Sequence, residues 1–351
     1  MRPGVAMKAL SKPKAVTIYE VARRAGVSIA TVSRALRDSS LVTEATRDRV
    51  RAAAEELNFR PSRLGRSLAE GRHAANGIVF PDLVGPYYAE VVLGYEEVAA
   101  DLGHSVLILA THGRRDAAAQ VLDLASRVDG MAIMGNTVAD DVVHTIAAAR
   151  LPLVLLARPP VAGVDTIRTR NEQTAAELAA HLAEHGHRRV VFLGDPAASP
   201  DVAGRLAGLT AGLRAAGLPA PTAIPTGLDV TSGEDATRRL LARRGRRPDA
   251  IVCANDEVAL GVHLAVGATG LHIPTDLAVT GWDDVFAARF AGLTTVGQPM
   301  RELGATAARW LHERIAQHQE EEQDPPHAVR RRVLPTRLVV RRSCGAHSPE
   351  V

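Results

Sequence analysis

The sequence has little cysteine, few aromatic residues and no long apolar run, and each shortage excludes a class of protein. Its 351 residues include only two cysteines, Cys253 and Cys344, whose spacing fits neither a disulfide framework nor a zinc site. No segment approaches the length of a membrane-spanning helix, and the N-terminus lacks the apolar run that a signal peptide needs. We therefore expect a cytoplasmic protein with no membrane partner.

Motifs of catalysis and of nucleotide binding are also missing. No nucleophile motif or dinucleotide fingerprint appears, and residues 81–86 do not form the glycine-rich loop that a phosphate-binding fold needs early in its sheet. We therefore expect neither an enzyme nor a cofactor.

Charge is distributed unevenly along the chain. Residues 1–73 contain 15 Lys and Arg against 7 Asp and Glu, whereas the remainder contains 27 against 32. A basic N-terminal region on an acidic body indicates a polyanion bound at the N-terminal end only. We expect residues 1–15 to form a flexible basic arm.

Residues 16–60 have the pattern of a small helical domain. Thr17 followed by Glu20 is a capping box that begins a helix, and Gly26 supplies a sharp turn after it. Ser28 is suited to cap a second helix, and Thr43 a third. Two short helices with a glycine turn, braced by a third, form a helix-turn-helix whose second helix enters the DNA major groove.

The second helix has two different faces. Its buried side is expected to pack with the third helix, through Val32, Leu36, Val50, Ala54 and Leu57. On the outward side, Ile29, Ala30 and Arg34 are candidates for base readout, because an arginine fork can bind guanine O6 and N7. The candidates for phosphate contact are Thr17, Ser28, Thr31, Ser33 and Thr43.

The run from Thr17 to Arg34, with residues 55–61 after it, resembles the lactose/galactose repressor family. The resemblance extends roughly to Cys344. It implies that the hinge segment, residues 61–73, forms a short helix on the operator, where Leu68 wedges into the minor groove with Leu64 on the same face. A plain flexible tether is the alternative interpretation of this segment.

From Ala75 onward, short apolar runs alternate with amphipathic segments, which predicts an α/β body of parallel sheets with helices on both faces. The alternation restarts at Asn171, so we expect two doubly wound subdomains. The resemblance implies the architecture of periplasmic sugar-binding proteins. On that basis residues 74–170 with 298–322 form the first effector-binding subdomain, and residues 171–297 with 323–342 form the second.

Polar residues stand where strands of the body should end, which is where open sheets of this kind bind ligands. The resemblance implies that Arg205, Asn255 and Asp283 contact a small-molecule effector, and a carboxylate with an arginine fork suits the hydroxyl groups of a sugar. Tyr88 and Met300 are expected to line the apolar side of the site. Asp256 and Asp284 are interpreted as caps of the helices that follow them.

Two observations leave the effector open. Ala157 stands where some sugar-responsive relatives place Asp, and no aromatic residue lies near Leu228 to stack on a pyranose ring. A purine or a sugar phosphate therefore remains an alternative to a free sugar. His181 and His185 share a helix face, but no further ligand completes a set, so we expect no metal.

These features predict a sequence-specific transcription regulator, and specifically a repressor, whose operator affinity is controlled by a small carbohydrate. Its expected partners are palindromic double-stranded operator DNA, the effector and a second copy of the chain, since one helix-turn-helix gives little specificity. A solute-binding receptor shares such a body. It should carry an export signal and lack the basic N-terminal domain, and this chain shows the reverse.

Overall fold

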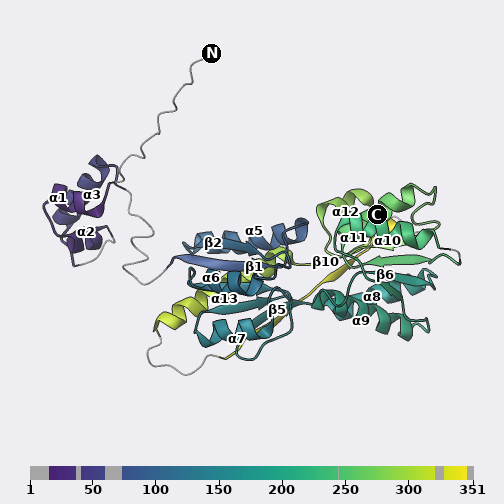
Figure 1. The fold of residues 1–351 in the computed structure, drawn as a ribbon. Helices are drawn as coiled ribbons and strands as arrows, with labels where there is room; N and C mark the ends of the chain where they lie inside the picture. The colour runs from purple at the N-terminus through teal and green to yellow at the C-terminus, as the bar shows by residue number, and fades with distance from the viewer. Residues whose placement is uncertain (1–15, 37–40, 60–72, 244, 321–327, 346–351) are drawn as a thin grey trace, which may run out of the picture. The chain divides into compact units, whose positions relative to one another are not determined.

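The computed structural model describes residues 16–36, 41–59, 73–243, 245–320 and 328–345. The chain divides into two compact units, Met1–His73 and Ala74–Val351, which we call the N-terminal unit and the body (Figure 1). The expected arm at residues 1–15 and the hinge residues Leu64 and Leu68 lie outside the described residues.

The N-terminal unit is the expected helix-turn-helix with its bracing helix: α1 (Ile18–Ala25), α2 (Ile29–Ala35) and α3 (Glu44–Glu56). The capping box is present, and the Thr17 N–H donates to the Glu20 carboxylate at 2.7 Å. Gly26 ends α1 with a φ of 67°, a left-handed conformation that glycine adopts without strain. The Ser28 hydroxyl accepts from the Thr31 N–H at 3.1 Å and so begins α2.

A small core holds the three helices together. It is formed by Val21, Ala22, Val32, Ala35, Val42, Val50, Ala53 and Ala54, with Leu36 and Leu57 packed at its edge. The Arg24 guanidinium also pairs with the Glu56 carboxylate at 2.6 Å, which links α1 to α3. The turn between the helices and the position of α2 therefore follow from local capping and from one shared apolar face.

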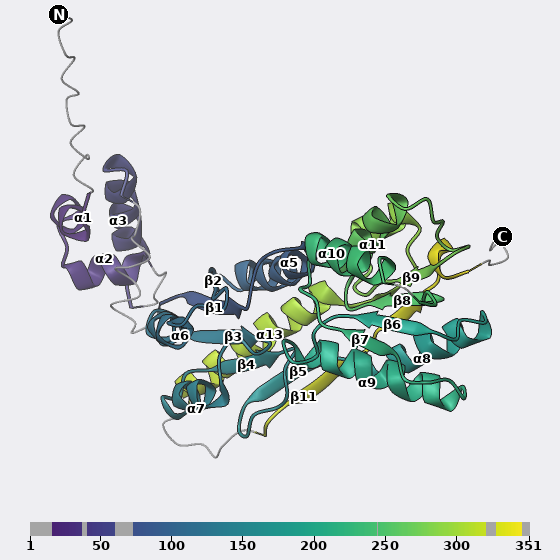
Figure 2. The ribbon, with the colours of Figure 1, turned by 45° about the vertical axis from the view of Figure 1, so that its right-hand side comes forward.

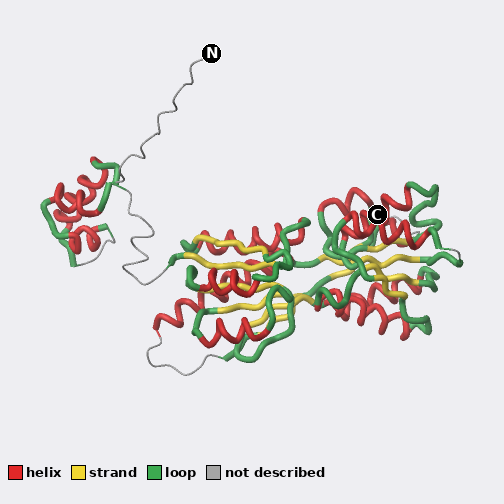
Figure 3. Tube along the Cα trace, viewed as in Figure 1, coloured by secondary structure: helices red, strands yellow, loops and turns green. Residues whose placement is uncertain are grey.

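The first lobe of the body is a six-stranded parallel sheet with helices on both faces (Figures 1 and 3). Its strand order is β11-β5-β4-β3-β1-β2, with β1 (Ala75–Phe80), β2 (Ser105–Ala110), β3 (Gly130–Met134), β4 (Leu153–Leu156), β5 (Asp165–Thr169) and β11 (Arg331–Leu334). Helices α5 (Pro86–Asp101) and α13 (Met300–Glu320) pack on one face, and α6 (Ala117–Ala125) and α7 (Asp140–Ala148) on the other.

The alternation of side chains along the strands produces these two layers. Ile78 and Phe80 pack toward α5 and α13, whereas Val79 between them packs toward α6 and α7. On the first of these faces, α5 and α13 cross closely (Figure 2). The backbones are so near that a Cβ added at Gly94 would lie 2.0 Å from the Arg301 carbonyl oxygen. Glycine is therefore required at this crossing.

The second lobe repeats the arrangement around a four-stranded parallel sheet of order β7-β6-β8-β9. Its strands are β6 (Val190–Leu193), β7 (Thr222–Ile224), β8 (Ala250–Cys253) and β9 (Ala278–Thr280). Helices α8 (Asn171–Glu184) and α9 (Pro200–Ala215) cover one face, and α10 (Val230–Leu241), α11 (Asp256–Gly267) and α12 (Phe286–Ala291) cover the other. The α/β fold class with two doubly wound sets is confirmed.

The C-terminal strands correct one expectation about the subdomains. We placed residues 323–342 in the second subdomain, but β11 pairs in parallel with β5 and extends the sheet of the first lobe. The buried Asp165 carboxylate accepts from the Arg330 backbone N–H at 2.8 Å and from its guanidinium, which holds the start of β11 against β5. The chain crosses to the other lobe only afterwards, where β12 (Arg337–Val339) pairs antiparallel with β10 (Thr295–Gly297).

Within the residues that the structure describes, no helix is both long enough and apolar enough to cross a membrane.

Candidate functional site

The exposed face of α2 carries the three residues expected to read bases. Ile29 is 39% exposed, and Ala30 and Arg34 are exposed beside it. Val32 and Ala35 face the core instead. The helix therefore presents an apolar and a guanidinium group outward together, as a helix that reads a major groove does.

The hydroxyl groups expected to bind phosphates are engaged in local contacts. The Thr17 hydroxyl donates to the Glu20 carboxylate at 3.1 Å, and the Thr43 hydroxyl donates to the Thr46 hydroxyl oxygen at 3.0 Å. Thr17, Ser28 and Thr43 are exposed, whereas Thr31 and Ser33 are half-buried. A phosphate contact from these groups would replace bonds that also stabilise helix starts.

A cavity of about 200 Å³ lies between the two lobes of the body, at the carboxyl ends of strands from both sheets. The first lobe lines it with Pro81, Val84, Tyr87, Tyr88, Met134, Gly135, Asn136 and Ala157. The second lobe lines it with Ala198, Ser199, Asp201, Val202, Arg205, Leu228, Asn255, Glu257 and Asp283. Four of the five residues expected to contact an effector, Tyr88, Arg205, Asn255 and Asp283, thus share one cavity.

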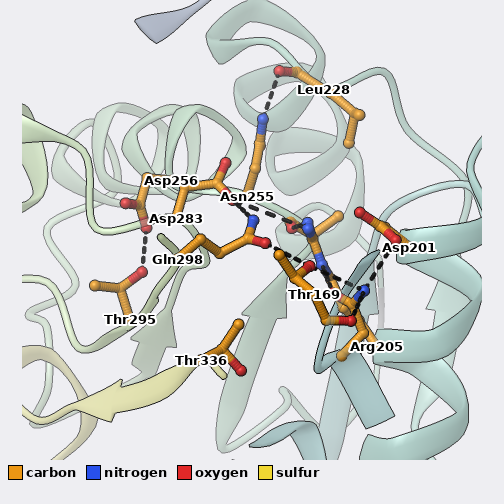
Figure 4. Close-up of polar contacts among 12 residues, drawn as sticks. Thr169, Asp201, Arg205, Leu228, Asn255, Asp256, Asp283, Thr295, Gln298 and Thr336 are labelled. Carbon is orange, nitrogen blue, oxygen red and sulfur yellow. Dashed lines mark hydrogen bonds and ion pairs between the residues drawn. The ribbon is translucent and has the colours of Figure 1, made fainter. Parts of the chain in front are cut away.

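Arg205 occupies the centre of a buried polar network in the second lobe (Figure 4). Its Nε donates to the Asn171 side-chain oxygen at 3.0 Å, and its Nη1 donates to the Ala254 carbonyl oxygen at 2.5 Å. Its Nη2 lies 3.9 Å from Asp283 Oδ1, and its guanidinium lies 4.8 Å from the centre of the Trp282 ring. The protein therefore fixes the guanidinium in place and leaves Nη2 directed toward Asp283.

Asp283 is buried and strained, which is common at binding sites. Its φ of 113° is rare for a residue with a side chain. The Gln298 side-chain amide donates to Asp283 Oδ1, and the Thr169 hydroxyl donates to the other end of Gln298 at 2.8 Å. Burial raises the pKa of Asp283 well above its ordinary value, while the nearby Arg205 opposes this shift.

Asn255 has a structural task as well as a place at the cavity. Its side-chain oxygen accepts from the Val258 N–H at 3.0 Å and so caps α11, and its amide donates to the Leu228 carbonyl oxygen at 2.9 Å (Figure 4). An effector contact from Asn255 would have to share these groups. Met300, the fifth expected residue, begins α13 and packs against the core of the first lobe rather than lining the cavity.

The interpretation of Asp256 and Asp284 as helix caps is wrong. The Asp256 carboxylate accepts from the Thr295 hydroxyl at 2.6 Å (Figure 4) and also from the Val285 N–H at 2.9 Å. It therefore joins α11 to segments that follow β9. Asp284 pairs with Arg341 at 2.6 Å and ties the C-terminal segment to the second lobe. Both acids make long-range contacts that local spacing could not reveal.

Sequence reasoning missed Asp201, Glu257 and Tyr87 among the polar residues of the cavity. Asp201 stands four residues before Arg205 in α9, so helical spacing alone places the two on one face. Glu257 follows Asn255 by two residues in the first turn of α11. The Tyr87 hydroxyl is buried and has no hydrogen-bond partner among the described residues.

A larger hollow of about 1030 Å³ runs beside this cavity and shares Asp201 with it. Arg168, Arg170 and Glu172 line it, together with residues of α8 and α9 near the point where these helices pack against each other. Fewer buried polar side chains converge there than in the interlobe cavity, which we therefore take as the candidate ligand site. The histidines of α8 serve elsewhere, since His181 Nε2 lies 3.2 Å from Cys344 Sγ.

Comparison with known proteins matches both parts of the chain. Residues 17–62 match the model of bacterial regulatory proteins of the lacI family, and residues 179–344 match a periplasmic binding protein-like domain. Catabolite control protein A of Priestia megaterium is 32% identical over 84% of this chain and 91% of its own length. The ribose operon repressor of Escherichia coli K12 is 33% identical over 86% of this chain and 93% of its own length.

The fold is similar as well. A solved lac repressor dimer bound to operator and an anti-inducer superposes with a TM-score of 0.80 at 29% identity, covering 95% of this chain and all of that one. A helix-turn-helix unit followed by a two-lobed body with a polar cavity is the architecture of a DNA-binding transcription regulator, and the relatives named above are repressors and control proteins. The chain belongs to the lacI family of bacterial regulatory proteins.

Proposed function

We propose that the protein is a cytoplasmic repressor that binds a palindromic operator as a homodimer and changes its operator affinity when a small carbohydrate binds between the lobes. The observation that carries this proposal is the convergence of Arg205, Asn255 and Asp283 on one cavity, with Tyr88 on the opposite wall. The similarity to a ribose operon repressor supports a sugar as the effector, and the similarity to a lac repressor bound to operator supports operator DNA as the partner.

On DNA, Ile29, Ala30 and Arg34 read base edges, and Thr17, Ser28, Thr31, Ser33 and Thr43 contact phosphates. The exposure of the first three residues on α2 supports this division. Leu68 and Leu64, in the hinge, are proposed to enter the minor groove. Effector binding shifts one lobe against the other, alters the spacing of two hinges in a dimer, and so couples the cavity to the operator.

The body exposes apolar side chains that suit a second copy of the chain. Phe286 and Phe290 of α12 are 73% and 74% exposed. Their rings contact each other edge to face, with 4.9 Å between the ring centroids. Leu264 of the neighbouring α11 is also exposed, and so are Leu107 and Ile108 on the edge strand β2 of the first lobe. Exposed apolar groups that lie together, as Phe286 and Phe290 do, mark association surfaces. The match to a lac repressor dimer supports the same partner.

Operator binding with and without effector tests the proposal. An operator would be selected from random DNA with the full chain, and affinity followed by fluorescence anisotropy at several salt concentrations and with sugars, sugar phosphates and purines. We expect a palindromic site, an affinity that falls steeply with salt, and a sugar that changes it. A response to purines alone would overturn the carbohydrate effector, and selection of no DNA site would overturn the operator.

Removal of the Arg34 guanidinium should distinguish sequence-specific contact with a base from general electrostatic attraction to DNA. Arg34→Ala should weaken binding to the selected operator by about 10-fold to 100-fold and relax the preference at one base pair, because it removes a two-pronged contact with guanine. Arg49→Ala removes the same charge from an exposed position on α3. It should weaken operator and random DNA alike. Equal loss of specificity in both variants would contradict the role of Arg34.

A further inference from the structure

Glu257 is a buried acid that the fold does not use. It lies in the first turn of α11, is 8% exposed and lines the interlobe cavity. Neither carboxylate oxygen has a hydrogen-bond partner among the residues that the structure describes. Burying a carboxylate without a partner is costly, so its presence indicates a contact supplied from outside the chain.

Glu257 reaches across the cavity to the first lobe. A Cβ added at Gly85 would lie 2.7 Å from Glu257 Oε1, so the glycine leaves room for the carboxylate. Gly85 directly precedes α5, whose first turn contributes Tyr87 and Tyr88 to the same cavity. Burial, with the negative charges of Asp283, Asp82 and Glu257, raises the pKa of Tyr88 to about 12. The carboxylate therefore faces the opening between the lobes rather than the core of the second lobe.

The charges of the cavity favour hydrogen-bond donors. Among the described residues that line it, the carboxyl groups of Asp201, Glu257 and Asp283 face the single guanidinium of Arg205. That guanidinium already donates to Asn171 and to the Ala254 carbonyl oxygen. Asp201 and Asp283 each use one oxygen within the protein, and Glu257 uses neither. Burial raises the pKa of all three acids, so the cavity already disfavours negative charge, and the engaged guanidinium would not offset the charge of an added phosphate group.

We propose that Glu257 is a further specificity-determining residue, which accepts hydrogen bonds from the effector, and that the effector is an unphosphorylated, hydroxyl-rich molecule. This inference rests on the proposed carbohydrate function and narrows it. Two hydroxyl groups of such a molecule satisfy the two free carboxylate oxygens, and closure of the lobes places them between Glu257 and the first turn of α5. A phosphorylated sugar of the same shape is disfavoured, because its charge would be buried beside three acidic groups and beside a guanidinium that the protein already engages.

Calorimetric titration of the full chain tests this with matched compounds. The panel contains pentoses, hexoses and disaccharides, each paired with its phosphate ester, such as ribose with ribose 5-phosphate. We expect a free sugar to bind at least about 100-fold more tightly than its phosphate. Glu257→Gln should weaken that sugar about 10-fold and reduce the discrimination against the phosphate, because it removes one negative charge without changing the shape of the side chain.

Controls separate this role from a structural one. Glu184→Gln removes an exposed acid from α8 and should leave both affinities unchanged. Glu257→Ala should weaken the sugar further, and a thermal melt followed by far-ultraviolet circular dichroism checks separately that this variant is folded. A change in stability alone would leave the ratio between sugar and phosphate as it is in the unmodified protein.

The outcomes distinguish this inference from the function on which it rests. A phosphate that binds as tightly as its free sugar, or Glu257→Gln with unaltered affinities, overturns the inference and leaves a carbohydrate-responsive regulator in place. Absence of binding by every sugar and every sugar phosphate overturns the carbohydrate effector itself, and the inference with it.

Discussion

The two walls of the interlobe cavity differ in chemistry. The second lobe provides every charged side chain among the described residues that line it, Asp201, Arg205, Glu257 and Asp283, and the first lobe provides Tyr87, Tyr88, Asn136 and apolar groups. This difference suggests a division of labour in which the second lobe recognises the effector and the first lobe closes over it. Under this proposal, closure would exclude water and so strengthen the polar contacts made on the opposite wall.

The segments in which the chain passes from one lobe to the other connect the effector-binding residues to the relative position of the lobes. Thr169 ends β5 in the first lobe and donates to Gln298, which in turn donates to Asp283 in the second lobe (Figure 4). Both Thr169 and Gln298 lie next to points where the chain passes between the lobes. A change in lobe angle therefore acts directly on the carboxylate that we propose binds the effector.

Asp256 is a buried acid of the second lobe that we expect to affect the stability of the fold and not the binding of the effector. Burial raises its pKa from 3.8 to about 7, although its bonds to Thr295 and Val285 act in the opposite direction. Because the folded-state pKa is the higher one, the protonated acid stabilises the fold below about pH 4, and this contribution is lost as the pH rises through about 7. At about 1.4 kcal/mol per pKa unit, the change is at most about 4 kcal/mol.

Asp256→Asn should therefore flatten the dependence of the melting temperature on pH between about 4 and 7, while the sugar affinity stays within a few-fold. Asp235→Asn, at an exposed position of α10, is the matched control and should keep the slope. A variant that kept the full slope would show that Asp256 is not the titrating group.

The contrast between the walls predicts unequal effects of small changes. Asp283→Asn should weaken effector binding about 100-fold, because it replaces one acceptor oxygen beside Arg205 with an amide donor that faces the guanidinium. Tyr88→Phe removes one hydroxyl from the opposite wall and should weaken binding less than about 5-fold. Calorimetry with the tightest sugar of the panel measures both. Similar losses in the two variants would mean that recognition is shared evenly between the lobes.

Much of the fold could be predicted from sequence because its signals are local. The capping box at Thr17, the glycine at Gly26 and the apolar strands of both sheets each act over a few residues. The polar strand β5, the exposed three-residue β7 and the short β10 carry no such signal, and sequence reasoning passed over them. The position of β11 depends on the ion pairs of Asp165 with distant arginines, which spacing does not reveal.

The site was predictable to the extent that it follows strand ends. Arg205, Asn255 and Asp283 stand after β6, β8 and β9, and the resemblance to a known family selected them from other polar residues. Glu257 could not be selected in this way, because only the structure shows that its buried oxygens have no partner among the described residues. The prediction that Met300 lines the cavity was wrong, because an apolar residue after a strand packs into a core as readily as into a cavity.

A charge can be introduced into the first-lobe wall of the cavity by substitution of Ala157. This residue has a φ of 51°, a conformation in which Asp and Asn are the best tolerated side chains, so both substitutions should fold. Ala157→Asp sets a carboxylate opposite three others and should weaken effector binding about 10-fold by opposing closure, whereas Ala157→Asn should change it less than about 3-fold. Titration of both variants with the same sugar separates charge from size. Tighter binding by Ala157→Asp would show that the first lobe can recognise the effector directly, and the division between the walls would then be an accident of this sequence rather than a requirement of the site.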